Sequence, residues 1–200
     1  MPNVPSSWHF LWRSLPFVTC CGFKTSTMLT VRFRQSFLRD AKMDITTTLC
    51  RLCHTYQVLR KGRVKEEAVV VMMSDDFSNH PQNKEPGIIR HELGGQDVYF
   101  GVRKDYSGEN PTLSNLVAVL MGNKRLLNGG SRRVISPNPN GKVFLFIYAH
   151  GDDGLVGISE REVVTKEKLF EIISQLFKII SQNYISGKYQ SMVILFKLFI

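Results

Sequence analysis

Apolar residues along this chain follow two periods, one typical of helices and one typical of strands. Residues 44–61, 115–122 and 164–184 repeat apolar side chains every three or four positions, which predicts amphipathic helices. Asp44 or Thr46 is a candidate cap for the first helix. Short β-branched or aromatic runs predict buried strands, and these lie at 66–76, 142–150 and 189–196.

Helices and strands therefore alternate along the chain. This order predicts an α/β fold with a mainly parallel central sheet between helices. The stretch 77–96 contains several Pro and Gly residues and is expected to be a long loop, followed by a short strand or hairpin at 97–102. In open parallel sheets, ligands and reacting groups collect at the carboxyl ends of the strands. The ends of the predicted strands are therefore where chemistry is expected.

Residues 1–43 differ in composition from the rest and are expected to form a basic, irregular leader before a domain at 44–200. Residues 1–66 hold 11 Lys and Arg against three Asp and Glu, so most of the formal charge of +9 lies there. The leader contains Arg, Ser and Thr and almost no acid, a composition also found in transit peptides. It is not a clear secretory signal, and a targeting segment and a mispredicted N-terminus both stay open.

Composition narrows the list of partners. No apolar run reaches the roughly 18–20 residues that a membrane span needs, so no transmembrane segment is expected. The basic N-terminal third could bind nucleic acid, but no pattern of stacking aromatic residues accompanies its charge, so no nucleic-acid partner is expected. The sequence leaves the oligomeric state open.

The four cysteines all lie within the first 53 residues, and two of them belong to the segment CRLCH at 50–54. This spacing formally matches a haem-attachment pattern and half of a zinc site. The adjacent pair Cys20 and Cys21 does not supply the other half of a zinc site in its usual form. On the predicted helix, Cys50 and Cys53 share one face, which favours buried packing. No metal and no cofactor are therefore expected.

The strand 142–150 ends on His150, and Gly151 follows it. An imidazole titrates near neutral pH and can act as a general base at a strand end. Glycine has no side chain, so the N–H of Gly151 could approach a reacting carbonyl oxygen. Asp152 and Asp153 are expected to be solvated acids of a turn.

Several segments together resemble the legumains, the asparaginyl endopeptidases also known as vacuolar processing enzymes. The quoted segments are CHTYQVLRKGRVKEEAVVVMMSDD, PGIIRH, DVYFGVRKDYSGE, NLVAVLMGNKRLLNGGSRRV, VFLFIYAHGDDGLVG and YQSMVILF. They occur in the family's order over about residues 50–196. The resemblance implies a caspase-like three-layer fold, incomplete at both ends in this chain. It also implies a Cys–His dyad and cleavage of protein or peptide substrates after asparagine in a lysosome or vacuole.

By the same resemblance, His150 matches the catalytic histidine and Gly151 the glycine of the oxyanion hole. The chain departs from the family at the nucleophile, because Phe199 stands where the cysteine is expected and no cysteine follows Cys53. A phenyl ring offers no lone pair for covalent catalysis. Lys197 stands at the expected glutamate of the asparagine pocket, which reverses the local charge.

Two interpretations follow from this mixture of match and departure. The chain is a legumain-like cysteine endopeptidase whose catalysis is impaired, or it is a non-catalytic fragment or pseudoenzyme. The acidic segment after His150 also resembles the related transamidase that attaches glycosylphosphatidylinositol anchors, although the neighbouring segments favour legumain. A basic binding module built on the leader is a further alternative.

Overall fold

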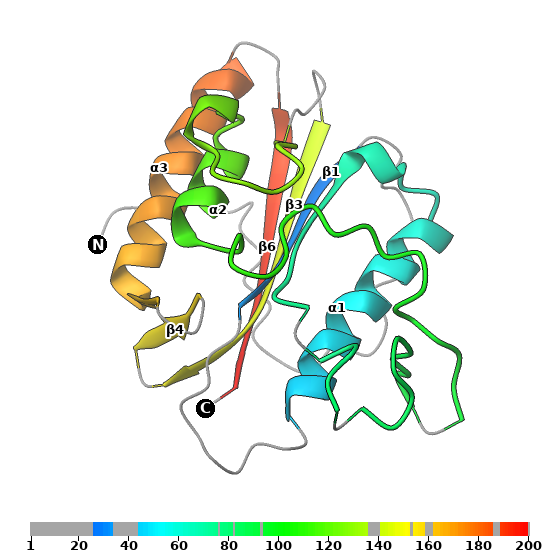
Figure 1. The fold of residues 1–200 in the computed structure, drawn as a ribbon. Helices are drawn as coiled ribbons and strands as arrows, with labels where there is room; N and C mark the ends of the chain where they lie inside the picture. The colour runs from blue at the N-terminus through cyan, green and yellow to red at the C-terminus, as the bar shows by residue number, and fades with distance from the viewer. Residues whose placement is uncertain are drawn as a thin grey trace.

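The fold is described from a computed structural model of the chain (Figure 1). The described residues are 26–33, 44–75, 77–81, 83–92, 94–135, 141–152, 154–158, 162–185 and 189–199. Their elements, in order, are β1 Ser26–Phe33, α1 Asp44–Lys61, η1 Glu66–Ala68, β2 Val69–Met72, α2 Leu113–Leu120, η2 Lys124–Leu126, β3 Gly141–Asp152, β4 Leu155–Gly157, β5 Val163–Thr165, α3 Lys166–Ile185 and β6 Tyr189–Phe199.

The strands of the described residues form one sheet in which β1 and β3 are the central members. β1 pairs in parallel with β2 and with β3, and β3 pairs in parallel with β6. The short strands β4 and β5 extend the sheet from the end of β3 in antiparallel pairs. The carboxyl ends of β1, β3 and β6 therefore lie together at one edge of the sheet.

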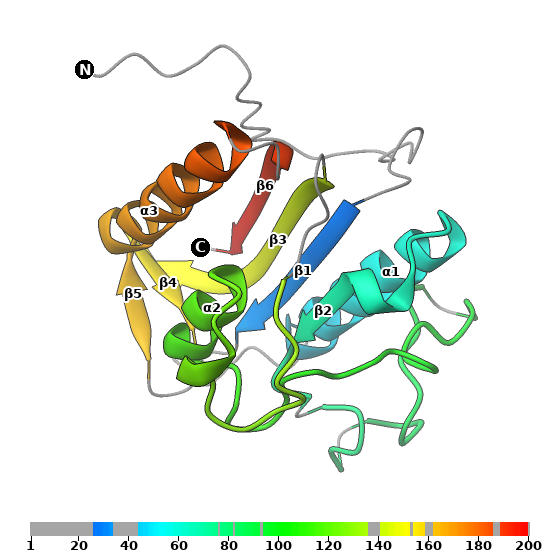
Figure 2. The ribbon, with the colours of Figure 1, turned by 90° about the horizontal axis from the view of Figure 1, so that it is seen from above.

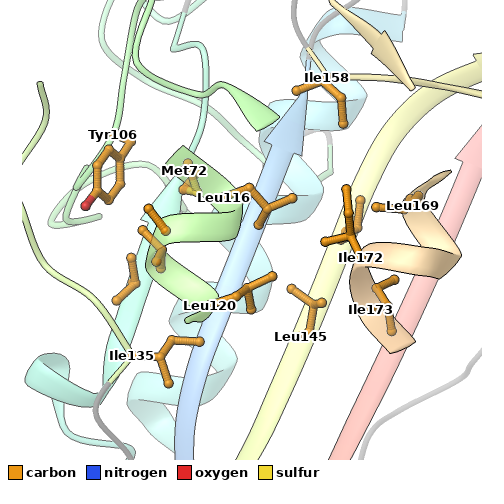
Figure 3. Packing of buried hydrophobic residues seen from close by; sticks show 14 of the residues in the cluster. Met72, Tyr106, Leu116, Leu120, Ile135, Leu145, Ile158, Leu169, Ile172 and Ile173 are labelled. Atoms are coloured by element: carbon orange, nitrogen blue, oxygen red, sulfur yellow. The ribbon is translucent and has the colours of Figure 1, made fainter. Parts of the chain in front are cut away.

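Alternating side chains of β2 and β3 supply two separate cores, as the two-residue period of a strand requires. On one face, Val69 and Val71 pack with Leu52 and other buried residues of α1. On the other face, Val70 and Leu145 pack with residues of α2 and α3. Figure 3 shows Leu145 of β3 facing Leu120 of α2 and Ile172 and Ile173 of α3. The view from above shows α1 on one side of the sheet and α2 and α3 on the other (Figure 2).

The helices that the sequence predicted are present with small changes at their ends. α1 begins at Asp44 and ends at Lys61, as expected, and Gly62 donates to the Val58 carbonyl just beyond the end. The Thr112 side chain caps α2 by accepting the Asn115 N–H at 3.2 Å. This satisfies one of the N–H groups that the first turn of a helix leaves without a partner.

The prediction of an irregular leader is wrong for residues 26–33. These residues form β1, which lies between β2 and β3 and pairs with both along its length. Without β1, the facing edges of β2 and β3 would carry unpaired backbone groups, so pairing with two strands at once stabilises a segment of weak local pattern. The rest of the leader lies outside the described residues.

Two other local predictions are corrected. β3 does not stop at His150 but continues to Asp152, and Asp152 pairs with Leu155 across a tight turn. Gly154, in this turn, has a φ of +73°, which suits a short hairpin loop. Residues 97–102 form turns rather than a strand, with only a bridge between Asp97 and Arg90.

Candidate functional site

The predicted dyad positions lie on neighbouring strands at the carboxyl edge of the sheet. His150 of β3 is the register partner of Phe199 of β6. Ala149, one residue earlier, pairs with Phe33 at the end of β1. The carboxyl ends of β1, β3 and β6 thus lie side by side, and α/β folds place reacting groups at such strand ends.

The other two predicted positions are on the same strands. Gly151 is the register partner of Val156 in the antiparallel pair of β3 with β4. Lys197 is the register partner of Tyr148, two residues before His150. The four predicted site positions are thus brought together by β3 and β6, and the roles assigned to them remain predictions.

A polar cluster that the sequence analysis did not single out lies just after β2. Asp75 accepts hydrogen bonds from the Tyr99 hydroxyl at 2.7 Å and from the Ser78 hydroxyl at 3.1 Å, and its carboxylate pairs with Lys104 at 2.8 Å. The Lys104 ammonium also contacts the Tyr99 hydroxyl and lies 4.2 Å from the centre of its ring. Asp75 has a φ of +52°, so these bonds hold a strained turn.

The surroundings of Lys104 in this cluster favour its charged form. Burial opposes the charge of Lys104, but hydrogen bonds to Asp75 and Tyr99 outweigh it and raise the pKa of Lys104. Burial also raises the pKa of Tyr99, which therefore stays neutral near pH 7. The cluster ties the 77–99 loop to the carboxyl end of β2. In the sequence, the polar residues at the end of the predicted strand 66–76 are the signal that could have identified this cluster.

A buried ion pair explains the motifs GVRKDYSGE and NGGSRRV. The Asp105 carboxylate is fully buried and accepts from Arg133 at 3.0 and 3.1 Å and from the Ser131 hydroxyl at 2.8 Å. Asp105 also accepts the Val71 N–H of β2 at 3.0 Å, and Arg133 donates to the Val69 carbonyl. These residues therefore join two loops to β2.

Tyr106 and Gly130 belong to the same contact between the two loops and β2. The buried Tyr106 hydroxyl donates to the Arg133 carbonyl at 2.7 Å, and burial raises the pKa of Tyr106 to about 12. A Cβ on Gly130 would lie 2.4 Å from the Tyr106 ring, and its φ is +65°. Only glycine fits both the space and the backbone angle. The contacts of Asp105, Tyr106, Gly130 and Arg133 in these motifs therefore stabilise the fold.

The cysteines of α1 are buried, as predicted. Cys50 donates from its sulfur to the Arg90 carbonyl at 3.3 Å, and Cys53 is fully buried. Burial raises the pKa of Cys50 to about 11, which disfavours the thiolate needed for nucleophilic attack. Across the described ranges, no group of three or more His, Cys, Asp or Glu is placed to hold a metal ion. Cys20 and Cys21 lie outside these ranges.

The remaining histidines of the described residues make ring contacts. His54 of α1 and His91 form an edge-to-face pair with ring centres 4.2 Å apart. His80 stacks on Phe77 with centres 5.8 Å apart. His9 lies outside the described residues.

Comparison with known proteins assigns the chain to a family. The profile of the Peptidase C13 family matches residues 47–197. The chain belongs to the peptidase C13 family. A vacuolar-processing enzyme beta-isozyme of Arabidopsis thaliana is 40% identical over 143 residues, and a legumain of Canavalia ensiformis is 41% identical over 143 residues. A vacuolar-processing enzyme of Citrus sinensis is 38% identical over 142 residues.

These matches cover 71–72% of this chain but only 27–29% of the relatives. The C13 match includes β2, β3, α2 and α3 and reaches Lys197 in β6. β1, which lies before the matched range, pairs with strands inside it. In the described part of this C13 chain, no helix is long and apolar enough to cross a bilayer.

Proposed function

We propose that this chain carries the histidine half of a legumain-like cysteine endopeptidase centre and that its own catalysis is impaired. The observation that carries the proposal is the register of β3 and β6, in which His150 is the partner of Phe199. The resemblance assigns the nucleophilic cysteine to residue 199. A phenyl ring cannot attack a carbonyl carbon, so His150 has no thiol to deprotonate there.

In the proposed centre, His150 is the general base and the Gly151 N–H is a donor of the oxyanion hole. A thiol at residue 199 would transfer its proton to His150 and attack the carbonyl carbon of a peptide bond after asparagine. The oxygen of that carbonyl would gain negative charge, which an N–H donor stabilises. Lys197 replaces the expected pocket glutamate, so recognition of asparagine is expected to be impaired as well.

The family membership supports a caspase-like three-layer fold for the domain, with the sheet of β1, β2, β3 and β6 as its central layer. We place the start of this domain at β1 instead of residue 44, because β1 pairs with two of its strands. The names of the relatives support protein substrates and a vacuolar or lysosomal site of action. A non-catalytic role is the second candidate, and Phe199 is the residue that favours it.

The test uses the purified 200-residue chain and a fluorogenic peptide with asparagine at the cleaved bond. We expect no turnover above that of a His150→Ala variant at any pH between about 5 and 8, the range in which imidazole titrates. An active legumain serves as the positive control. Asparagine-specific cleavage that disappears in the His150→Ala variant would show that the chain is an active peptidase and overturn the proposal.

A further inference from the structure

Three basic side chains lie on the loop that leaves α2, and none of them has an ion-pair partner among the described residues. Lys124, Arg125 and Arg132 are all exposed. Arg132 donates to the Lys124 carbonyl at 3.2 Å, so its guanidinium lies beside the η2 backbone.

Arg132 also has an unfavourable backbone conformation. Its φ is +58°, a left-handed angle that glycine adopts freely and arginine does not. The two glycines before it, Gly129 and Gly130, have φ values of +68° and +65°, so this turn is built from left-handed residues. An arginine in such a position is strained, and strain of this kind concentrates at binding and active sites.

An open hollow of about 350 Å³ lies at the same loop. Its lining residues are Gly122, Lys124, Arg133, Val134 and Ile135, and Arg133 is already paired with Asp105. A second hollow shares Gly122 and Lys124 and extends over Arg125. Leu126, on the same 3-10 helix, is 60% exposed. Together, the apolar lining and the cationic rim suit a ligand that has both acidic and apolar groups.

The hollow is remote from the His150 edge of the sheet. In the view of Figure 3, Ile135 and Ile158 lie at opposite ends of the cluster, Ile135 toward the tail of the β1 arrow and Ile158 toward its head. Ile135 donates to the Val119 carbonyl near the end of α2, so the hollow lies at the carboxyl end of that helix. His150 lies instead at the carboxyl ends of the strands. A ligand in the hollow would not occupy the proposed catalytic position.

We propose that this basic hollow is a docking site for an acidic peptide segment of another protein. The carboxylates of the segment would pair with Lys124, Arg125 and Arg132, and a neighbouring apolar side chain would contact Leu126. No aromatic side chain lines either hollow, so the base stacking that supports single-stranded nucleic-acid binding has no platform here. The proposal does not depend on catalytic activity.

The test measures binding of a fluorescent peptide of alternating Glu and Leu to the full 200-residue chain by anisotropy. The comparison peptide replaces every Glu with Gln. A triple variant removes the site charges through Lys124→Gln, Arg125→Gln and Arg132→Gly. We expect the acidic peptide to bind more tightly than its Gln version, and the triple variant to raise its Kd about fivefold to tenfold, because rim ion pairs contribute small, additive amounts. Added salt should weaken the binding.

A matched control removes the same charge elsewhere. Lys61, Arg63 and Lys65 are exposed, and Arg63 has a φ of +63°. Lys61→Gln, Arg63→Gly and Lys65→Gln therefore repeat the chemistry of the triple variant at the end of α1 and in the loop after it. This control should retain the wild-type Kd. Equal weakening by both triple variants would overturn the proposal, and so would equal affinity for the two peptides. Full displacement of the peptide by inorganic phosphate, or tighter binding of a single-stranded oligonucleotide, would also reject it.

Discussion

His150 and Phe199 occupy partner positions on the parallel strands β3 and β6, at the carboxyl edge of the sheet. Neighbouring strands lie about 4.8 Å apart, so residues at partner positions are direct neighbours. This strand spacing puts residue 199, where the nucleophilic cysteine is expected, next to His150. The pairing therefore predicts how reactive a thiol at residue 199 would be.

In a Phe199→Cys variant, the new thiol should react with iodoacetamide faster than it does when His150 is also changed to alanine. The imidazole accepts the thiol proton, and the imidazolium stabilises the thiolate, so the reactive pH range should move toward neutral. Peptide mapping separates this label from the buried Cys50 and Cys53. The matched control is Leu195→Cys, at the partner position of Phe146. Identical rates with and without His150 would contradict the dyad arrangement.

Asp105→Asn should destabilise the fold by about 3 kcal/mol or more, because it leaves the partly buried Arg133 guanidinium without its counter-charge. Urea unfolding measures the change. Glu85→Gln is the matched control, since the Glu85–Arg90 pair is exposed, with 50% and 34% of its side-chain surfaces open to solvent. Breaking an exposed pair should change the unfolding free energy by less than about 1 kcal/mol. Similar losses in both variants would show that the buried network contributes no special stability.

Gly130→Ala should unfold the protein at a lower temperature than Gly108→Ala does. Both glycines have positive φ, so each alanine has a backbone cost of about 1–2 kcal/mol. Only at Gly130 would the added Cβ meet the Tyr106 ring, whereas nothing lies within 4 Å at Gly108. Overpacking adds about 1–3 kcal/mol, and paired thermal melts measure the difference. Matching melts would mean that the loop shifts to make room.

His54 should make the fold less stable in acid. Burial lowers the pKa of His54, and the positive charges of His91, Arg51 and Lys61 lower it further, while Glu92 opposes them. The unfolded chain therefore binds a proton more readily than the folded chain, so the stabilisation is present above the ordinary histidine pKa of 6.5 and is lost as the pH falls below it.

The measurement is urea unfolding across this pH range. A His54→Gln variant should lose less stability than the wild type between neutral pH and about pH 5. His80→Gln, which changes a histidine stacked on Phe77, is the comparison. If the wild type and His54→Gln lose stability in parallel, His54 is not the group responsible.

Much of the local structure could be predicted because it depends on neighbours in the sequence. The apolar periods of residues 44–61 and 115–122 identified α1 and α2. The resemblance to legumains, since confirmed by the family match, also came from short local segments. The basic hollow was not predicted, because its residues come together only through the turn at Arg132.

The sequence by itself determined the helices, the buried strands β2 and β3 and the family, because periodic apolar side chains and local motifs decide these. Tertiary structure alone decided that residues 26–33 form β1, since the stabilising backbone bonds come from β2 and β3. It also decided that β3 continues through His150 to Asp152, because β4 returns to pair with it. Register is a property of two strands together, so only the folded sheet makes His150 the partner of Phe199.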